Sequence, residues 1–318
     1  MTPWEENACL LADGIRDVVA DSLRRQVVRV EMHANPYSSR HATGLSKCVF
    51  LDGSKMPVFW KRGPHSSEEG VGRLGSVGYE MDVYRALDGL EPRLAPRLIG
   101  VARAGADALL VTSFVDAALR VQRGPQPAAV VGAAVRIGEF QQRATSEGRG
   151  RQLQEYDSSV YSTWAERAVR KRPRSSWLRD VSRQFADVVI DLQRSSAVIV
   201  HGEYYPDNIL LTAIGVTAVD WEWAGMALGE IDLAALTEGS WGKQTVEACN
   251  EAYAKSRRFD ADDLMFRKRL AASRLYLHLR WIGATSQHHD ADLMRHRLNA
   301  SRTLARQLDL AAQGGASE

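Results

Sequence analysis

The chain has few of the features that stabilise secreted or membrane proteins. Its 318 residues include only three cysteines, Cys9, Cys48 and Cys249, which lie far apart and form no Cys-x-x-Cys pair. This spacing argues against a disulfide framework or a cysteine-based zinc site, and it favours a reducing compartment. No apolar run reaches about 18 residues, so we expect no membrane span. The first 17 residues contain neither a basic nor an apolar leader. We therefore expect a cytoplasmic protein.

The chain also lacks a strong excess of charge of either sign. Its 41 Lys and Arg against 39 Asp and Glu give a net charge of +2. Nucleic acid and anionic membranes are therefore not expected as partners. An apolar fraction of 45% and a charged fraction of 25% are typical of a globular protein. The length allows two domains or one large one, and nothing in the sequence indicates an oligomeric state.

Strand patterns dominate the first 115 residues. Asp52-Gly53 is a hairpin turn signal between two of the expected strands. The expected elements are a helix over 1–24, strands over 26–34, 45–53 and 54–63, a helix over 77–90, and two strands within 98–115. These patterns predict a β-rich N-terminal domain over residues 1–115.

Helical patterns dominate from residue 116 onward. The Pro-rich segment 122–130 is typical of a connector. Apolar residues recur on one side of helices expected over 177–194 and 264–282. Two short β-like runs, AVIVHGE and VTAVDWE, interrupt the helices. The sequence therefore predicts a larger helical domain over residues 116–318 and an α+β fold overall.

Polar residues follow each of the two short β-like runs. Glu203 and Asn208 lie in a Pro-containing loop after the strand Val198–Val200 of the first run, and Asp220 ends the strand of the second run. We expect these two strands to end side by side, which would bring the three side chains to one edge of the fold. Metal-assisted phosphoryl transfer uses three such groups. One carboxylate accepts a proton, and an amide oxygen and a second carboxylate bind Mg²⁺.

The segments HGEYYPDN (201–208) and DWEWAGMALGEIDLA (220–234) resemble those of the aminoglycoside phosphotransferase and choline kinase group. The usual patterns of that group are HGDxxxxN and DWExxxxxxxxxDLA. The resemblance covers most of the chain and is strongest over residues 198–240. It implies a protein-kinase-like bilobal fold, with a small β-rich N-lobe, a larger helical C-lobe and ATP between them.

The resemblance also implies how the nucleotide is held. Lys61, in VFWKRG, would hold the phosphates of ATP or GTP, and Glu80, near the start of the next helix, would orient it. The loop 35–44, with Ser38 and Ser39, would cover the phosphates. The remaining nucleotide-binding residues that it implies lie in the strand leading to the adenine-gripping segment: Val111 and Ser113.

The resemblance assigns the chemistry to the two motifs. Glu203 would accept the proton of a small-molecule hydroxyl, while Asn208 and Asp220 would coordinate Mg²⁺. Asp232 would brace the catalytic loop and His201 would bond to backbone. The acceptor stays open among antibiotics, sugars, amino alcohols and natural-product intermediates. The 12 Lys and Arg against 7 acidic residues over 255–318 disfavour a polycationic drug.

Glu203 departs from the family pattern, which has Asp at this position. The additional methylene moves the carboxylate outward by about 1.5 Å, and a misplacement of that size can cost about 100-fold in rate. Two alternatives follow. Either the loop is built around Glu and the protein is active, or it is a pseudokinase-like nucleotide- or ligand-binding protein with little turnover. We favour activity, because Lys61, Asn208 and Asp220 are all retained.

Overall fold

The computed structural model describes residues 3–34, 40–66, 71–91, 93–104, 106–116, 119–121, 127–213, 215–239, 241–284 and 291–310. Contacts between Cα atoms divide the chain into two compact units. The first comprises residues 1–69, 73–119 and 210–223, and the second comprises 70–72, 120–209 and 224–318. The sequence placed a boundary after residue 115. By contacts, the first unit continues to Leu119 and also takes in Leu210–Trp223.

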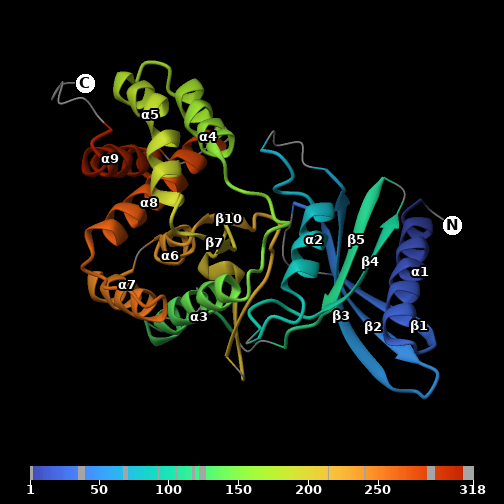
Figure 1. Cartoon of the computed structure of the whole chain (residues 1–318). Helices are drawn as coiled ribbons and strands as arrows, with labels where there is room; N and C mark the ends of the chain where they lie inside the picture. The colour runs from blue at the N-terminus through green and yellow to red at the C-terminus, as the bar shows by residue number, and fades with distance from the viewer. Residues whose placement is uncertain are drawn as a thin grey trace. The chain divides into compact units, whose positions relative to one another are not determined.

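The first unit is built on a five-stranded antiparallel sheet with the strand order β1-β2-β3-β5-β4 (Figure 1). The elements expected from the sequence are confirmed, although β2 begins three residues earlier than the predicted strand. Their bounds are α1 (Pro3–Leu23), β1 (Val27–Ala34), β2 (Ala42–Phe50), β3 (Lys55–Pro64), α2 (Val77–Leu87), β4 (Leu98–Ala104) and β5 (Asp107–Ser113).

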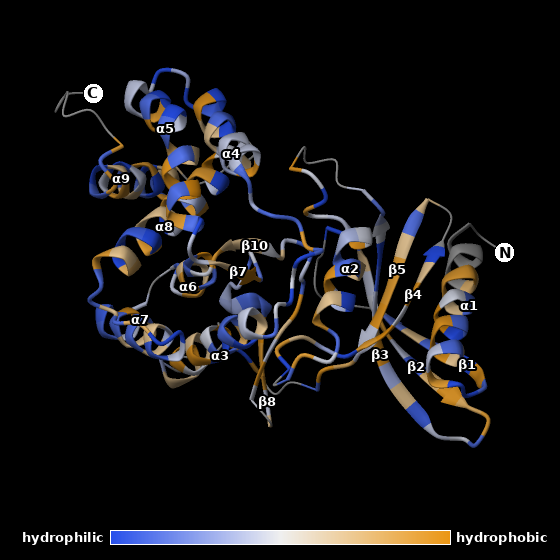
Figure 2. Cartoon of the chain, viewed as in Figure 1, coloured by the Kyte–Doolittle hydropathy of each residue, from blue (hydrophilic) through white to orange (hydrophobic). Residues whose placement is uncertain are grey.

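Strand alternation gives the two faces of this sheet different partners. On one face, Trp60 and Val111 pack in a buried cluster with residues of α1, and Figure 2 shows how apolar β5 is. Neighbouring residues of a strand point to opposite faces. Lys61 and its cross-strand partner Leu110 therefore face the other side, where α2 packs against β3 and β5. The sheet thus places the Lys61 side chain beside α2.

The second unit is mainly helical. Among its described residues, α8 packs against α4, α5, α6 and α9, and two short strands, β7 and β10, pair antiparallel. The apolar stripe predicted over 177–194 is confirmed in α5, where Leu178, Val181 and Phe185 are buried. The bounds are α3 (Pro127–Ser146), α4 (Ser158–Lys171), α5 (Ser176–Gln193), β7 (Ala197–Val200), β10 (Gly225–Leu228), α6 (Glu230–Leu236), α7 (Lys243–Ser256), α8 (Leu264–Ala284) and α9 (Ala291–Gln307).

The pairing of the short strands corrects one sequence-based expectation. The three remaining strands, β6 (Leu119–Arg120), β8 (Ile209–Thr212) and β9 (Gly215–Ala218), form a separate sheet in the order β6-β8-β9. β7, which precedes His201, pairs with β10, whereas β9, which precedes Asp220, pairs with β8. The two strands are therefore not neighbours in one sheet. Apolar patterning identified both runs as strands, but it carries no information about their partners.

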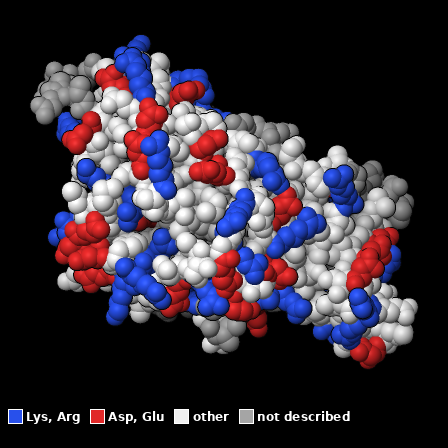
Figure 3. Space-filling model, in the orientation of Figure 1, with Lys and Arg blue, Asp and Glu red and all other residues white. Residues whose placement is uncertain are grey.

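Charges of both signs are mixed on the face of the protein that Figure 3 shows. On the face shown in Figure 3, Lys and Arg alternate with Asp and Glu, as expected for a net charge of +2. Among the described residues, no helix is long and apolar enough to cross a membrane.

Candidate active site

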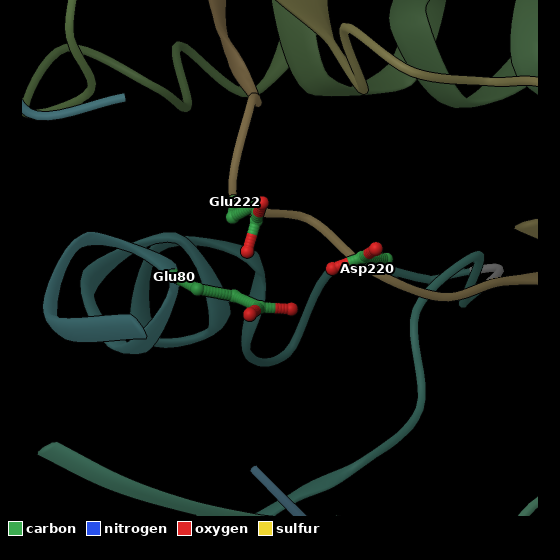
Figure 4. A group of neighbouring side chains, drawn as sticks. All are labelled: Glu80, Asp220 and Glu222. Carbon is green, nitrogen blue, oxygen red and sulfur yellow. The ribbon is translucent and has the colours of Figure 1, made fainter. Parts of the chain in front are cut away.

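Lys61 lies at the centre of a buried cluster of charges in the first unit. Its Nζ is 2.8 Å from Glu80 Oε2, 2.5 Å from Asp220 Oδ1 and 2.7 Å from Glu222 Oε2. Figure 4 shows the three carboxylates directed toward one another. Burial opposes the charge of the Lys61 ammonium, but the three carboxylates raise its pKa well above the ordinary value. The lysine is therefore held as a cation.

The start of α2 positions Glu80. Ser76 caps this helix, and its side chain accepts a hydrogen bond from the Tyr79 N–H, which fixes the first turn. Glu80 pairs with Lys61 through Oε2 and accepts the Trp221 N–H at Oε1, 2.9 Å away. Burial raises the pKa of Glu80 to about 7, and Lys61 opposes that rise. Glu80 thus joins the lysine to the backbone that follows Asp220.

Asp220 has an unusual backbone conformation. Its φ of 71° lies in the left-handed region, which Asp tolerates better than most residues other than Gly. Such conformations occur often at functional sites, where surrounding bonds hold them in place. The hydrogen bond from the Trp221 N–H to Glu80 supplies one such bond. The Asp220 side chain is 38% exposed, whereas those of Lys61 and Glu80 are buried. Asp220 is therefore the carboxylate of this group that solvent and ligands can reach.

Two residues of this cluster, Glu222 and His41, had no role predicted from the sequence. Glu222 Oε2 contacts Lys61 and also lies 3.1 Å from His41 Nε2. Burial opposes ionisation of Glu222, but His41 and Lys61 together lower its pKa to about 2. The second acidic position of the DWE motif was a signal for Glu222. His41, at the end of the loop 35–44, carried no signal of its own.

The first unit offers ligand atoms for a metal ion. One carboxylate oxygen from each of Glu80, Asp220 and Glu222 lies within 4.8 Å of the others. Carboxylate oxygens are the ligands that Mg²⁺ prefers. Three carboxylates around one ammonium leave an excess of negative charge, which a divalent cation would balance. The donor set present here therefore fits Mg²⁺.

In the second unit, Asp232 holds the loop that follows β7. Its carboxylate accepts the backbone N–H groups of His201 and Gly202, each at 2.9 Å, and the Gln141 Nε2 at 3.0 Å. Burial raises the pKa of Asp232 to about 7, and these three hydrogen bonds oppose the rise. Hydrogen bonds from the loop backbone to Asp232 are what its predicted bracing role requires. Gln141 takes part, and its Oε1 in turn accepts the Tyr253 hydroxyl, 2.6 Å away.

The same loop carries Glu203 and Asn208. His201 Nδ1 accepts the Glu203 N–H at 3.3 Å, so His201 supports the loop from within. The Asn208 amide nitrogen donates to the Glu203 backbone carbonyl, 3.0 Å away. This bond uses the NH₂ group, so the amide oxygen is the Asn208 atom suited to bind a metal. The Glu203 carboxylate forms an ion pair with Arg280 of α8, which was not predicted as a site residue.

The other predicted nucleotide-binding residues are not brought into this cluster. Val111 is fully buried in the core under α1, so its side chain lies away from the Lys61 cluster, and its assignment to nucleotide binding stays a prediction. The Ser113 Oγ accepts the Arg97 N–H, 3.0 Å away, and so holds the neighbouring segment of chain. Ser38 and Ser39 lie outside the described residues.

The structure thus assembles two groups of predicted residues, one in each unit. Lys61, Glu80 and Asp220 meet in the first unit. In the second, the described hydrogen bonds connect Glu203 to Asn208 and His201 to Asp232. Binding of a single metal ion by Asn208 and Asp220 stays a prediction.

The chain is similar in fold to several solved structures whose names are those of kinases and phosphotransferases. The choline kinase of Cryptosporidium parvum Iowa II matches with a TM-score of 0.57 at 13% identity, covering 88% of this chain and 89% of that one. A choline/ethanolamine kinase family protein of Mesorhizobium loti matches with a TM-score of 0.57 at 17% identity, covering 95% and 99%. The aminoglycoside phosphotransferase APH(3'')-Id of Streptomyces rimosus, solved with ADP and streptomycin, matches with a TM-score of 0.52 at 19% identity, covering 74% and 90%.

These likenesses confirm the predicted kinase-like fold, with an antiparallel sheet in the N-terminal part and helices in the C-terminal part. The comparison with curated protein sequences gives no match. The model of the phosphotransferase enzyme family matches residues 58–267, which is well over half of the chain. The chain therefore belongs to the phosphotransferase enzyme family.

Proposed function

We propose that the protein transfers the γ-phosphate of ATP or GTP to a hydroxyl group of a small molecule. The observation that carries this proposal is the buried Lys61–Glu80 ion pair with the partly exposed Asp220 beside it. Phosphoryl transfer in kinase-like folds uses such a lysine to hold phosphates and such an aspartate to hold Mg²⁺. Membership of the phosphotransferase family supports the same reaction class.

The first unit would bind and orient the nucleotide. Lys61, kept charged by its carboxylate neighbours, would donate to phosphate oxygens, and Glu80 would fix its direction. Asp220, together with Asn208, would hold Mg²⁺, which neutralises phosphate charge when bound. Glu222 and His41 would keep the lysine in place beneath the phosphates. Most of the rate enhancement would come from positioning and charge stabilisation.

The second unit would supply the base. The Glu203 side chain is 23% exposed and therefore accessible to an acceptor. Its carboxylate would accept the hydroxyl proton as the acceptor oxygen attacks the γ-phosphorus. A base of this kind contributes about 10²- to 10⁴-fold to the rate. Acceptors to consider are antibiotics, sugars, amino alcohols and natural-product intermediates.

A phosphate-transfer screen tests the proposal. The purified protein is incubated with ATP or GTP and Mg²⁺ over a panel of hydroxyl compounds, and mass spectrometry detects the phosphorylated product. Lys61→Met and Asp220→Asn should each abolish transfer. Lys55→Met is the matched control, because Lys55 lies on the same strand but pairs with Glu31 at the surface. It should leave transfer unchanged.

Two outcomes would decide against the proposal. Transfer that persists unchanged in Asp220→Asn would show that the cluster is not the site of chemistry. Thermal stabilisation by Mg-ATP without product from any acceptor would favour the alternative, a pseudokinase-like binding protein in which Glu203 does not support turnover.

A further inference from the structure

Two consecutive residues of α8 hold the loop that carries Glu203. Arg280 Nη1 donates to the Gly202 carbonyl, 3.3 Å away, and its Nη2 donates to Glu203 Oε1. The next residue, Trp281, donates its indole N–H to the Tyr205 hydroxyl, 2.9 Å away. The loop is therefore fixed to one turn of α8 on both sides of Glu203.

Arg280 is suited to this contact because it is buried and charged. Only 8% of the residue is exposed, and a buried cation requires a well-placed anionic partner. Burial opposes the charge of the guanidinium, and Glu203 is the foremost of the groups that raise its pKa. The planar fork of arginine can bond a backbone carbonyl and a carboxylate at the same time. Lysine offers a single point charge instead.

The contact also accounts for Glu at position 203. An aspartate would end about 1.5 Å short of the present carboxylate, which is enough to break a hydrogen bond to Arg280. The longer side chain therefore reaches a partner that the usual aspartate would miss. The contact takes up one carboxylate oxygen, Oε1, and fixes the side-chain torsions.

We propose that Arg280 is a positioning residue for the phosphate transfer, holding Glu203 Oε1 so that Oε2 faces the acceptor. This inference rests on the proposed function. In the transfer step, Oε2 takes the acceptor hydroxyl proton and the acceptor oxygen bonds to the γ-phosphorus. The bond from that phosphorus to the bridging oxygen breaks, and the nucleoside diphosphate leaves with the electron pair.

A double-mutant cycle tests this role, using an acceptor from the transfer screen. Arg280→Met and Glu203→Asp should each lower kcat by about 100-fold, because each releases the carboxylate from its position. The KM for ATP should stay within about twofold, since the nucleotide-holding residues are untouched. The double variant should be no slower than either single variant, because both changes remove the same contact. If Arg280 had only a structural role, the kcat of the double variant should fall below that of Glu203→Asp alone.

Two further variants control for folding. Arg269→Met removes another buried pair of α8, in which Arg269 Nε lies 2.8 Å from Glu230 Oε1. It should lower the melting temperature while keeping kcat within about twofold. Arg280→Lys keeps the buried charge, so it should fold even if Arg280→Met does not. It should still lose about tenfold in kcat, because lysine cannot make both contacts.

The outcomes separate this inference from the proposed function. A wild-type protein that transfers no phosphate overturns the proposed function and, with it, the role of Arg280. If the wild-type protein transfers phosphate and Arg280→Lys keeps full kcat, the role of Arg280 is overturned while the proposed function stands. Glu203→Asp activity above the wild-type level would do the same, because the shorter base would then be the better placed one.

Discussion

We predict that stability and kcat both depend on the three hydrogen bonds that Asp232 accepts, because these bonds hold the loop that carries Glu203. Asp232 Oδ2 accepts from His201 and Gln141, and its Oδ1 accepts from Gly202. In Asp232→Asn, one of these oxygens becomes an NH₂ group of the same size. Whichever way the amide turns, at least one backbone N–H then faces another donor. In Asp232→Ala, all three donors lose their acceptor.

The expected losses follow from the burial of these groups. Asp232 is fully buried, so water does not replace the lost acceptor. An unsatisfied buried donor costs about 1–3 kcal/mol, which is the loss expected for Asp232→Asn. For Asp232→Ala we expect about 3–5 kcal/mol, because three buried donors lose their acceptor at about 1–3 kcal/mol each and neighbouring effects do not add fully. Looser backbone at 201 and 202 should also displace Glu203 and lower kcat by about 100-fold.

Urea unfolding and phosphate-transfer kinetics, measured on the same preparations, would test this prediction. Glu139→Gln is a suitable control, because Glu139 forms an exposed pair with Arg136 on α3. Such surface pairs contribute at most about 1 kcal/mol. If Asp232→Asn matched this control in both stability and kcat, the bracing role of Asp232 would be refuted.

Three further predictions concern stability. Ser76→Ala removes the cap of α2 and should cost about 1 kcal/mol in urea unfolding; an unchanged midpoint would contradict this. Gly78→Ala should destabilise the protein although Ala favours helices by about 1 kcal/mol, because the new Cβ would lie 2.4 Å from the His65 carbonyl oxygen; a higher melting temperature would disprove the clash. Burial, followed by the charge of Arg297, lowers the pKa of His278 from 6.5 to about 4. The unfolded chain therefore binds the proton first, and up to about 3 kcal/mol of stability is lost between pH 6.5 and 4. His278→Gln should flatten that part of the stability curve, and an unaltered slope would reject this origin.

The parts of the site that the sequence predicted are those fixed by local patterns. The resemblance to the kinase group selected Lys61 by its place on the third strand and Glu80 by its place near the start of the next helix. In the structure, cross-strand pairing sets the face that Lys61 occupies, and the cap at Ser76 sets where the helix of Glu80 begins. The spacing of the two motifs selected Asp220 and Asp232. Each of these inferences depends on residues within a few positions of one another.

The parts that the sequence missed depend on long-range pairing. The resemblance placed Val111 on the strand that leads to the nucleotide, but it did not indicate that the side chain faces α1. The strands before His201 and Asp220 were expected to be neighbours, but β10 and β8 are their partners. Arg280 lies 77 positions from Glu203. One apolar side was predicted for the helix over 264–282, but the buried residues of α8 lie all round the helix. The predicted side therefore did not indicate which residues face the loop.

The unusual Glu203 illustrates why a motif alone does not decide activity. A carboxylate displaced by one methylene is expected to be a poor base only if its surroundings are those of the shorter residue. Here a buried arginine takes up the additional length and bonds the preceding carbonyl as well. Lys61 is likewise held by three carboxylates rather than by Glu80 alone. Glu203 is therefore fixed by a partner outside the motif pattern, and Lys61 is fixed by both acidic residues of the DWE motif as well as by Glu80. Since a decayed site would have no reason to keep such matched partners, their presence favours a working phosphotransferase over a protein that only binds.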